Sequence, residues 1–154
     1  MKKILATVVS AGVLSALAAG TAHPAPYAGA GSTDSSRRLV GKWAGTVTHG
    51  GDTGDIQLIF TTSGKACLIT SAGVSKGSWK STGGAGDFNY KIAEAMTDAS
   101  GTQQGWIYID QTTHAVSNAF TSTGVSHVYD MAGNPQFTQV ADVSVHRIAG
   151  NPSC

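Results

Sequence analysis

Charged residues are scarce in this chain of 154 residues, because only 12% of them are Asp, Glu, Lys or Arg. So low a charge excludes a coiled coil or a long solvated helix. The formal net charge is +1, so the basic surface of a nucleic-acid-binding protein is absent and we expect no nucleic-acid partner. Cysteine and proline are also rare, with two and four residues, whereas glycine is abundant with 20. The length fits a single domain.

The N-terminal 22 residues have the pattern of a cleaved signal peptide. Lys2 and Lys3 form a basic start, a mostly apolar run covers 4–19, and small residues follow at 18–22. This run is too short for a membrane span, so we expect no membrane insertion of the mature protein; an uncleaved anchor is the alternative. Cleavage after Ala22 predicts a secreted protein, extracellular or periplasmic. Without the two lysines, 8 basic and 9 acidic residues remain, a net charge of −1.

Residues 23–38 are rich in Ala, Gly, Pro and Ser, and we interpret them as a flexible leader. From 39 to 154 the chain changes to short runs of β-branched and aromatic residues between Gly-containing turns, the pattern of an all-β domain. Eight strands are expected, at about 41–49, 55–62, 65–71, 75–81, 87–97, 102–111, 115–129 and 135–148. Three turns, at 62–64, 98–101 and 130–133, end in a Gly that suits positive φ. Sequential hairpins without helices predict an eight-stranded antiparallel up-and-down β-barrel, with a sandwich as the competing architecture.

Two short motifs at the ends of this domain carry a family resemblance. Gly41-Lys42-Trp43 on the first strand, with Arg147 near the end of the last, resembles the signature of lipocalins and the wider calycin superfamily, including small secreted bacterial barrels. The resemblance implies structural roles for Trp43 and Arg147, with the cation packed across the indole at the closed end of the barrel. It also implies an internal cavity but no particular ligand.

The two cysteines allow one intramolecular pair, Cys67 with Cys154, and export implies an oxidising environment. In an eight-stranded meander, the start of the third strand and the end of the eighth lie at the same end as Trp43. A disulfide there is sterically reasonable. A free or intermolecular thiol is the alternative.

Glu94 is the only glutamate in the chain. It falls in phase with apolar residues of its strand, which are Phe88, Tyr90, Ile92 and Met96. The turn at 98–101 pairs Asp98 with Thr102, which predicts that Glu94 lies opposite Trp106 and Ile92 opposite Tyr108. A carboxyl beside an indole inside a barrel has a raised pKa, which suits a general acid or base. The alternative is a hydrated rim carboxylate, or one paired with Lys91 or Lys80.

Two histidines accompany Glu94 at the expected open end. His49 is in phase with Trp43 and Val47, and the turn at 130–133 sets His127 opposite Phe137. These residues resemble a zinc site only in composition, because no H-x-H or H-E-x-x-H spacing holds them together. We therefore expect no metal and no cofactor.

The pattern favours a secreted protein that binds a small hydrophobic molecule in a barrel cavity. Orienting polar groups would be Glu94, His49 and His127, and the wall would consist of Phe88, Tyr90, Met96, Trp106 and Tyr108. The alternative is a cofactor-free cyclase or isomerase acting on a hydrophobic, polyketide-like substrate, with Glu94 and His127 as catalytic residues. A third interpretation is an interaction or inhibitor protein that uses its loops. A hollow interior favours the first two, and a filled one the third; the sequence predicts no oligomeric state.

Overall fold

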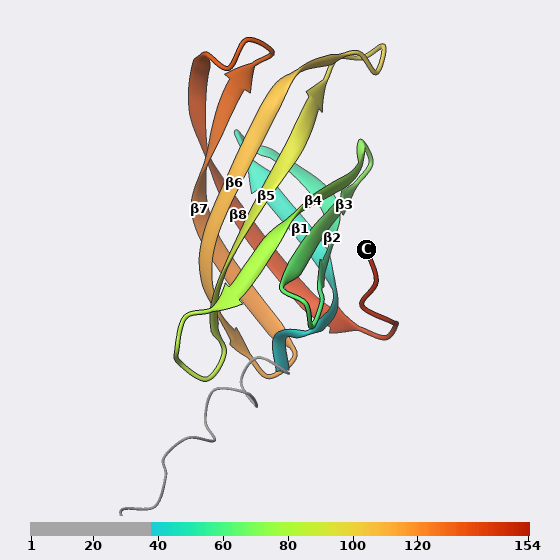
Figure 1. The fold of residues 1–154 in the computed structure, drawn as a ribbon, viewed down its shortest axis with the longest axis vertical. Helices are drawn as coiled ribbons and strands as arrows, with labels where there is room; N and C mark the ends of the chain where they lie inside the picture. The colour runs from blue at the N-terminus through green and yellow to red at the C-terminus, as the bar shows by residue number, and fades with distance from the viewer. Residues whose placement is uncertain (1–37) are drawn as a thin grey trace, which may run out of the picture.

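The computed structural model describes residues 38–154, which form a closed barrel of eight antiparallel strands (Figure 1). The strands are β1 (Gly41–His49), β2 (Asp52–Phe60), β3 (Lys65–Thr70), β4 (Gly73–Ser81), β5 (Asp87–Thr97), β6 (Gln103–Val116), β7 (Ala119–Asp130) and β8 (Pro135–Ile148). Each strand pairs with the next along the chain, and β8 returns to pair with β1.

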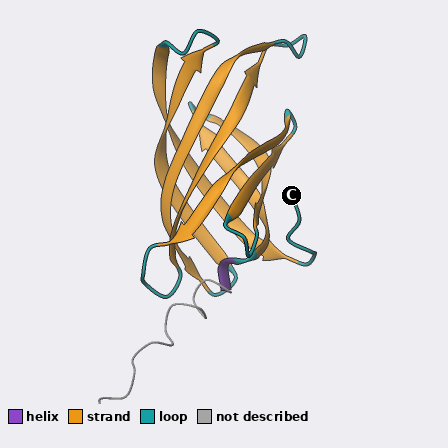
Figure 2. Cartoon of the chain, viewed as in Figure 1, coloured by secondary structure: helices purple, strands orange, loops and turns teal. Residues whose placement is uncertain are grey.

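This arrangement confirms the predicted all-β, up-and-down barrel and excludes the sandwich. Apart from a short helical turn at 38–39, the described residues are strands and their connections (Figure 2). No helix among them is long and apolar enough to cross a membrane. The predicted signal peptide at 1–22 and positions 23–37 of the predicted leader lie outside the described residues.

The barrel wall is taller on one side than on the other. β1 to β4 have six to nine residues each, whereas β5 to β8 have 11 to 14. The β5–β6 and β7–β8 hairpins consequently rise beyond the other two hairpins at the open end (Figure 1). Positions 94–97 of β5 and 135–140 of β8 have no partner on the shorter side. We call this projecting part of β5 to β8 the tall wall.

The opposite end of the barrel is closed by aromatic packing beneath Arg147. The Trp43 side chain is fully buried, and its ring contacts Phe120 edge-on at 5.0 Å between centroids. The Arg147 guanidinium lies 4.3 Å from the centre of the Trp43 ring. Arg147 also donates hydrogen bonds to the carbonyls of Val40, at 2.8 Å, and Arg38. The expected packing of the late arginine across the tryptophan is therefore present.

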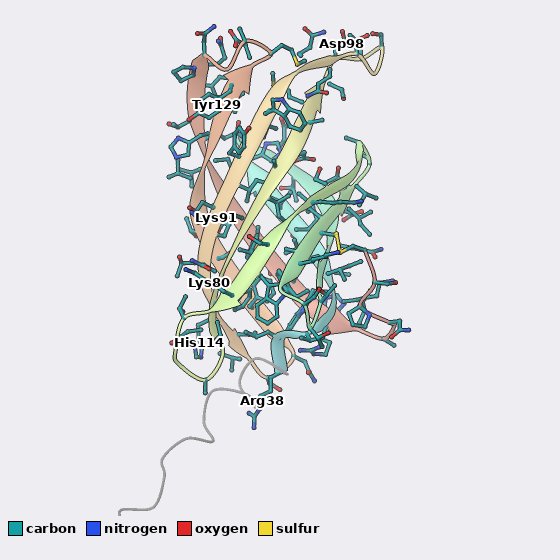
Figure 3. All side chains as sticks on the ribbon, viewed as in Figure 1. Arg38, Lys80, Lys91, Asp98, His114 and Tyr129 are labelled. Carbon is teal, nitrogen blue, oxygen red and sulfur yellow. A yellow bond between two sulfur atoms is a disulfide. The ribbon has the colours of Figure 1, made fainter. Side chains whose placement is uncertain are left out.

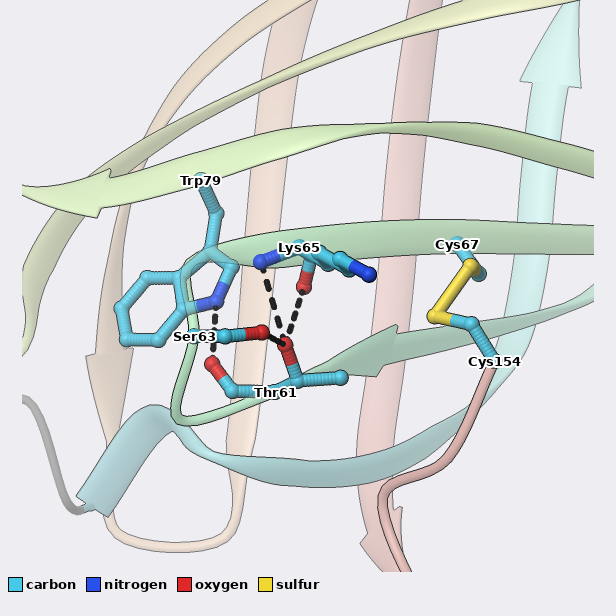
Figure 4. The surroundings of a disulfide bond; sticks show 6 residues. All are labelled: Thr61, Ser63, Lys65, Cys67, Trp79 and Cys154. Carbon is cyan, nitrogen blue, oxygen red and sulfur yellow. Dashed lines mark hydrogen bonds between the residues drawn. A yellow bond between two sulfur atoms is a disulfide. The ribbon is translucent and has the colours of Figure 1, made fainter.

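Cys67 and Cys154 form a disulfide, with 5.9 Å between their Cα atoms (Figure 4). The bond attaches the C-terminal tail to the outer side of β3, and no cysteine is left free. Ile59 of β2 pairs with Cys67. Its neighbours Leu58 and Phe60 face the core, so Ile59 points to the outer face, yet its side chain is buried. The predicted pairing is confirmed, and a disulfide is typical of an oxidising compartment.

The pairing of β5 with β6 contains a β-bulge that the sequence analysis missed. Gln104 is the extra residue in β6, and its side-chain amide donates to Asp98 Oδ2 at 2.8 Å. The predicted turn is present, but the bulge moves the register by one residue beyond it. Glu94 consequently lies opposite Ile107, and the prediction that it faces Trp106 is wrong.

A second bulge changes the pairing of β7 with β8 in the same way. Gln136 is the extra residue, and its amide donates to Asp130 Oδ2 at 3.2 Å. Val128 consequently lies opposite Phe137, so the predicted pairing of His127 with Phe137 is wrong. A shift of one residue moves a side chain to the other face of a sheet.

Both bulges follow the same local pattern, D-x-x-G-x-x-Q, at 98–104 and 130–136. In each, the aspartate side chain accepts backbone hydrogen bonds from the turn. The side-chain amide of the glutamine that ends the pattern donates to the same aspartate. The first bulge also pairs Ile92 with Ile109, where Tyr108 was predicted.

The connection between β6 and β7 also differs from the prediction. The expected turn at 112–114 is strand, and the chain reverses at 117–118. Ser117 is the one non-glycine among the described residues with positive φ, at 58°. The Thr113 hydroxyl points inward and donates to the Thr121 carbonyl at 2.7 Å. Polar residues that favour a turn by composition thus lie within a strand, with Thr113 on its inner face and Thr112 and His114 exposed.

Candidate functional site

The upper half of the barrel encloses a cavity of about 570 Å³. Its apolar wall includes Val47, Ile56, Met96, Ile107, Val128 and Phe137. The lower half is filled by the aromatic residues of the closed end, among them Phe60 and Phe88, whose ring centroids are 5.3 Å apart. The interior is therefore filled below and hollow above.

Glu94 lies in the wall of this cavity, as its phase along β5 predicts. The Thr70 hydroxyl donates to Glu94 Oε1 at 3.2 Å and so joins the β3–β4 hairpin to the tall wall. Burial raises the pKa of Glu94 above its ordinary value, although the Thr70 hydrogen bond and the nearby charge of His49 act in the opposite direction. The cavity thus contains one carboxyl group that binds its proton more tightly than an exposed glutamate.

The floor of the cavity carries a buried amide. The Gln111 side chain is 0% exposed, and its Nε2 donates to the Ala141 carbonyl at 3.4 Å. Gln111 Oε1 has no hydrogen-bond partner within residues 38–154. Gly124 makes room for this amide, because a Cβ atom there would lie 2.6 Å from Gln111 Cδ.

Tyr90 pairs with Gln111 across β5 and β6 and also lines the floor. Its hydroxyl lies 3.5 Å from the Ser122 hydroxyl. Desolvation raises the pKa of Tyr90 to about 12, while the Ser122 hydrogen bond lowers it. Tyr90 is consequently a neutral hydrogen-bonding group at every physiological pH.

The cavity brings together only some of the side chains named from the sequence. Four line it, which are His49, Tyr90, Glu94 and Met96. Phe88 is fully buried in the aromatic packing below and does not line the cavity.

Trp106, Tyr108 and His127 lie on the outer face of the barrel, and their expected place inside is wrong. The inward positions of these strands are Ile107, Ile109 and Val128. Both bulges contribute to the error, because each shifts the register by one residue near the open end. Glu94 and His127 therefore do not share a site.

Thr70 and Gln111 are site residues that the sequence analysis missed. Thr70 is the last residue of β3, and its hydroxyl reaches Glu94 because the β3–β4 hairpin ends at the level of Glu94 on β5. The sequence does not show how the ends of these strands are aligned. Gln111 occupies an inward position of a strand, where alternation predicts an apolar side chain. With the correct register of β6 against β5, Gln111 would have been predicted to lie opposite Tyr90 and to face inward.

No group of three His, Cys, Asp or Glu side chains within the described part of the chain is arranged to hold a metal ion. Comparison of the chain with family models, with curated proteins and with solved structures finds no match. The internal cavity and its side chains are consequently the features of the molecule that bear on its function.

Proposed function

We propose that this is an exported binding protein that holds a small, largely apolar molecule carrying a hydrogen-bond donor. The observation that supports this proposal best is the cavity of about 570 Å³ with the unpartnered Gln111 Oε1 at its floor. Binding sites for small molecules have volumes of about 300–1,000 Å³ and apolar walls with a few polar groups. The cavity has these features.

The polar floor favours one orientation of the ligand. A buried oxygen without a hydrogen-bond donor costs about 1–3 kcal/mol. A ligand hydroxyl or N–H group that displaces the side chains covering Gln111 Oε1 would recover part of this cost, since Gln111 is 0% exposed in this structure. The apolar remainder of the ligand would contact Ile107 and Val128, and its outer end would approach Glu94. The site thus favours a largely apolar, neutral molecule.

Export and relationship to the calycin superfamily belong to the same proposal. Export is supported by the signal-peptide pattern at 1–22 and by the disulfide. The relationship is supported by Gly41-Lys42-Trp43 and by the packing of Arg147 over Trp43. A barrel fold alone does not determine a ligand.

Binding inside the barrel is tested by filling the cavity. Ala141 on β8 lines it, whereas the adjacent Val140 faces outward and is 55% exposed. We expect Ala141→Phe to abolish the fluorescence increase of the neutral dye Nile red and Val140→Phe to leave it unchanged, with both variants folded by circular dichroism. Equal dye binding by the two variants would place the dye outside the cavity and refute the proposal.

The orientation is tested with two matched probes, 2-naphthol and 2-methoxynaphthalene, of which only the first can donate a hydrogen bond. One neutral hydrogen bond is worth about 0.5–1.5 kcal/mol, so the protein should prefer the naphthol by up to about tenfold. In Gln111→Leu this preference should disappear while both probes still bind. A preference that persists in Gln111→Leu would contradict the role of the amide. Native mass spectrometry of protein from its source would then identify the natural ligand.

A second candidate function, a cofactor-free isomerase or cyclase, is favoured by the raised pKa of Glu94 inside the cavity. In this function Glu94 would exchange a proton with a carbon atom of the bound molecule, without His127. Incubation of the co-purified molecule with the protein in D₂O should then introduce deuterium at carbon, and Glu94→Gln should abolish the exchange. If the unsubstituted protein binds the molecule without introducing deuterium, the isomerase or cyclase function is excluded and the carrier function remains.

A further inference from the structure

A second concave site lies on the outer face of the tall wall. It has a volume of about 590 Å³ and is separate from the cavity inside the barrel. Four side chains from β6 and β7 form its base, since Trp106 pairs with Tyr129 and Tyr108 with His127. The turn at 130–133 forms its upper border. We call these four side chains, with the turn, the outer aromatic site.

The rings of this site are accessible, in contrast to the other two tryptophans of the barrel. Trp106 is 37% and Tyr108 47% exposed, whereas Trp43 and Trp79 are buried. Tyr108 and Tyr129 meet at 85°, with 5.4 Å between their ring centroids. Two nearly perpendicular rings beside an indole form the kind of corner in which aromatic cages hold a cation.

The acidic group that borders the outer aromatic site is Asp130. Positions 92–146 contain no lysine or arginine, and Lys91, which lies on the outer face below Tyr108, is paired with Asp110 at 2.6 Å. Figure 3 shows Tyr129 near the tips of the tall hairpins and the labelled Lys91 and Lys80 lower on the barrel. No guanidinium or ammonium group of this segment is therefore present to pair an anionic ligand.

Asp130 places a fixed carboxylate at the border of the site. Its two oxygens accept hydrogen bonds from Asn134 and Gln136 side chains and from backbone amides of the turn. The Asn134 side chain, followed by backbone hydrogen bonds, holds the pKa of Asp130 below its ordinary value. The carboxylate consequently stays ionised at neutral pH in a defined position.

We propose that the outer aromatic site binds a small quaternary ammonium compound that carries no phosphate. Exposed π faces attract a methylated ammonium group, and the carboxylate of Asp130 adds a Coulombic contribution. A phosphate attached to the ammonium would be repelled by the same carboxylate, and the nearby ammonium of Lys91 is already paired with Asp110. The chemistry therefore points to choline or a similar cation in solution and disfavours a phosphocholine group.

Trp106 provides a specific signal for this binding. It is the exposed member of the three tryptophans, so acrylamide quenching of tryptophan fluorescence reports mainly on this site. We expect choline to protect Trp106 from acrylamide in a saturable manner. Its neutral isostere, 3,3-dimethylbutan-1-ol, should be at least about tenfold weaker, because the cation–π and Coulombic attractions are lost. Phosphocholine should also be weaker than choline.

Variants separate this site from the cavity. Tyr108→Leu keeps an apolar side chain but removes one ring, and it should weaken choline binding at least about fivefold. The matched control is Val125→Leu, an exposed position of the outer face of β7 away from the site. Ala141→Phe, which fills the internal cavity, should leave choline binding unchanged, so that failure of the cavity proposal and failure of this one are distinguishable.

Four results would overturn the proposal. The first is the absence of saturable protection by choline, and the second is equally strong binding of the neutral isostere, which would indicate an apolar site. The third is stronger protection of Trp106 by cellohexaose than by choline, which would indicate a saccharide site. The fourth is an equal effect of Tyr108→Leu and Val125→Leu on choline binding, which would show that the aromatic rings do not bind the cation.

Discussion

Replacing Arg147 by methionine tests how the closed end of the barrel is held. Methionine keeps much of the apolar packing over Trp43 but removes the charge and the donors. The partly exposed cation–π contact is worth about 0.5–1 kcal/mol. The charge-assisted hydrogen bond to the partly buried Val40 carbonyl adds about 1.5 kcal/mol, and the exposed one to Arg38 less. We therefore expect Arg147→Met to lower the free energy of unfolding by about 2–3 kcal/mol.

Urea denaturation followed by tryptophan fluorescence measures this loss. The matched control is His146→Met, because His146 precedes Arg147 on β8 and is exposed. This control should change the free energy of unfolding by no more than about 0.5 kcal/mol. The free energy of unfolding of Arg147→Lys should lie between those of the parent and of Arg147→Met. The lysine ammonium retains the charge but lacks the forked set of donors of the guanidinium. A loss in Arg147→Met no larger than in His146→Met would refute this account of the closed end.

Three further variants or treatments address the core, the disulfide and the cavity carboxyl. Trp43→Ala should lower the free energy of unfolding by about 3–5 kcal/mol in the same assay, and unchanged stability would contradict its place in the core. The Cys67–Cys154 bond spans 87 residues, so its reduction should cost up to about 4–5 kcal/mol, and intact mass with and without reductant should show a gain of two hydrogens. Because folding raises the pKa of Glu94 above 4.5, the folded protein binds this proton more tightly, and stability falls as pH rises from about 4.5 through the folded pKa. Glu94→Gln should remove this decrease and be at least as stable at pH 7; a steeper decrease or lower stability would indicate a stabilising carboxylate.

The strands of the lower barrel could be predicted because their alternation is unambiguous. Phe88, Tyr90 and Ile92 alternate with polar residues, and this phase also placed Glu94 and Met96 inside correctly. The residues that meet at the closed end could be predicted from the number of strands, because the up-and-down order determines which strand ends lie together. Local pattern and topology point to the same structure in this part of the chain.

The phase of β6 could not be predicted from alternation. Trp106, Ile107, Tyr108 and Ile109 are all apolar, so either set could face inward. Only the register across the hairpin decides between them, and the extra Gln104 changes that register. The choice of the larger aromatic residues as cavity wall was therefore wrong for a physical reason, because a single inserted residue determines the face of every residue beyond it.

The two bulges connect the internal cavity with the outer aromatic site. In β6 the shift directs Ile107 into the cavity and Trp106 out to the tall wall, so both proposed sites depend on Gln104 and its hydrogen bond to Asp98. Removing Gln104 would restore the simple hairpin register beyond the turn and exchange the two faces of β6. An indole would then compete for the cavity volume, and the outer site would lose a ring. A single inserted residue at the turn thus determines which residues of β6 face the cavity and which face the outer aromatic site.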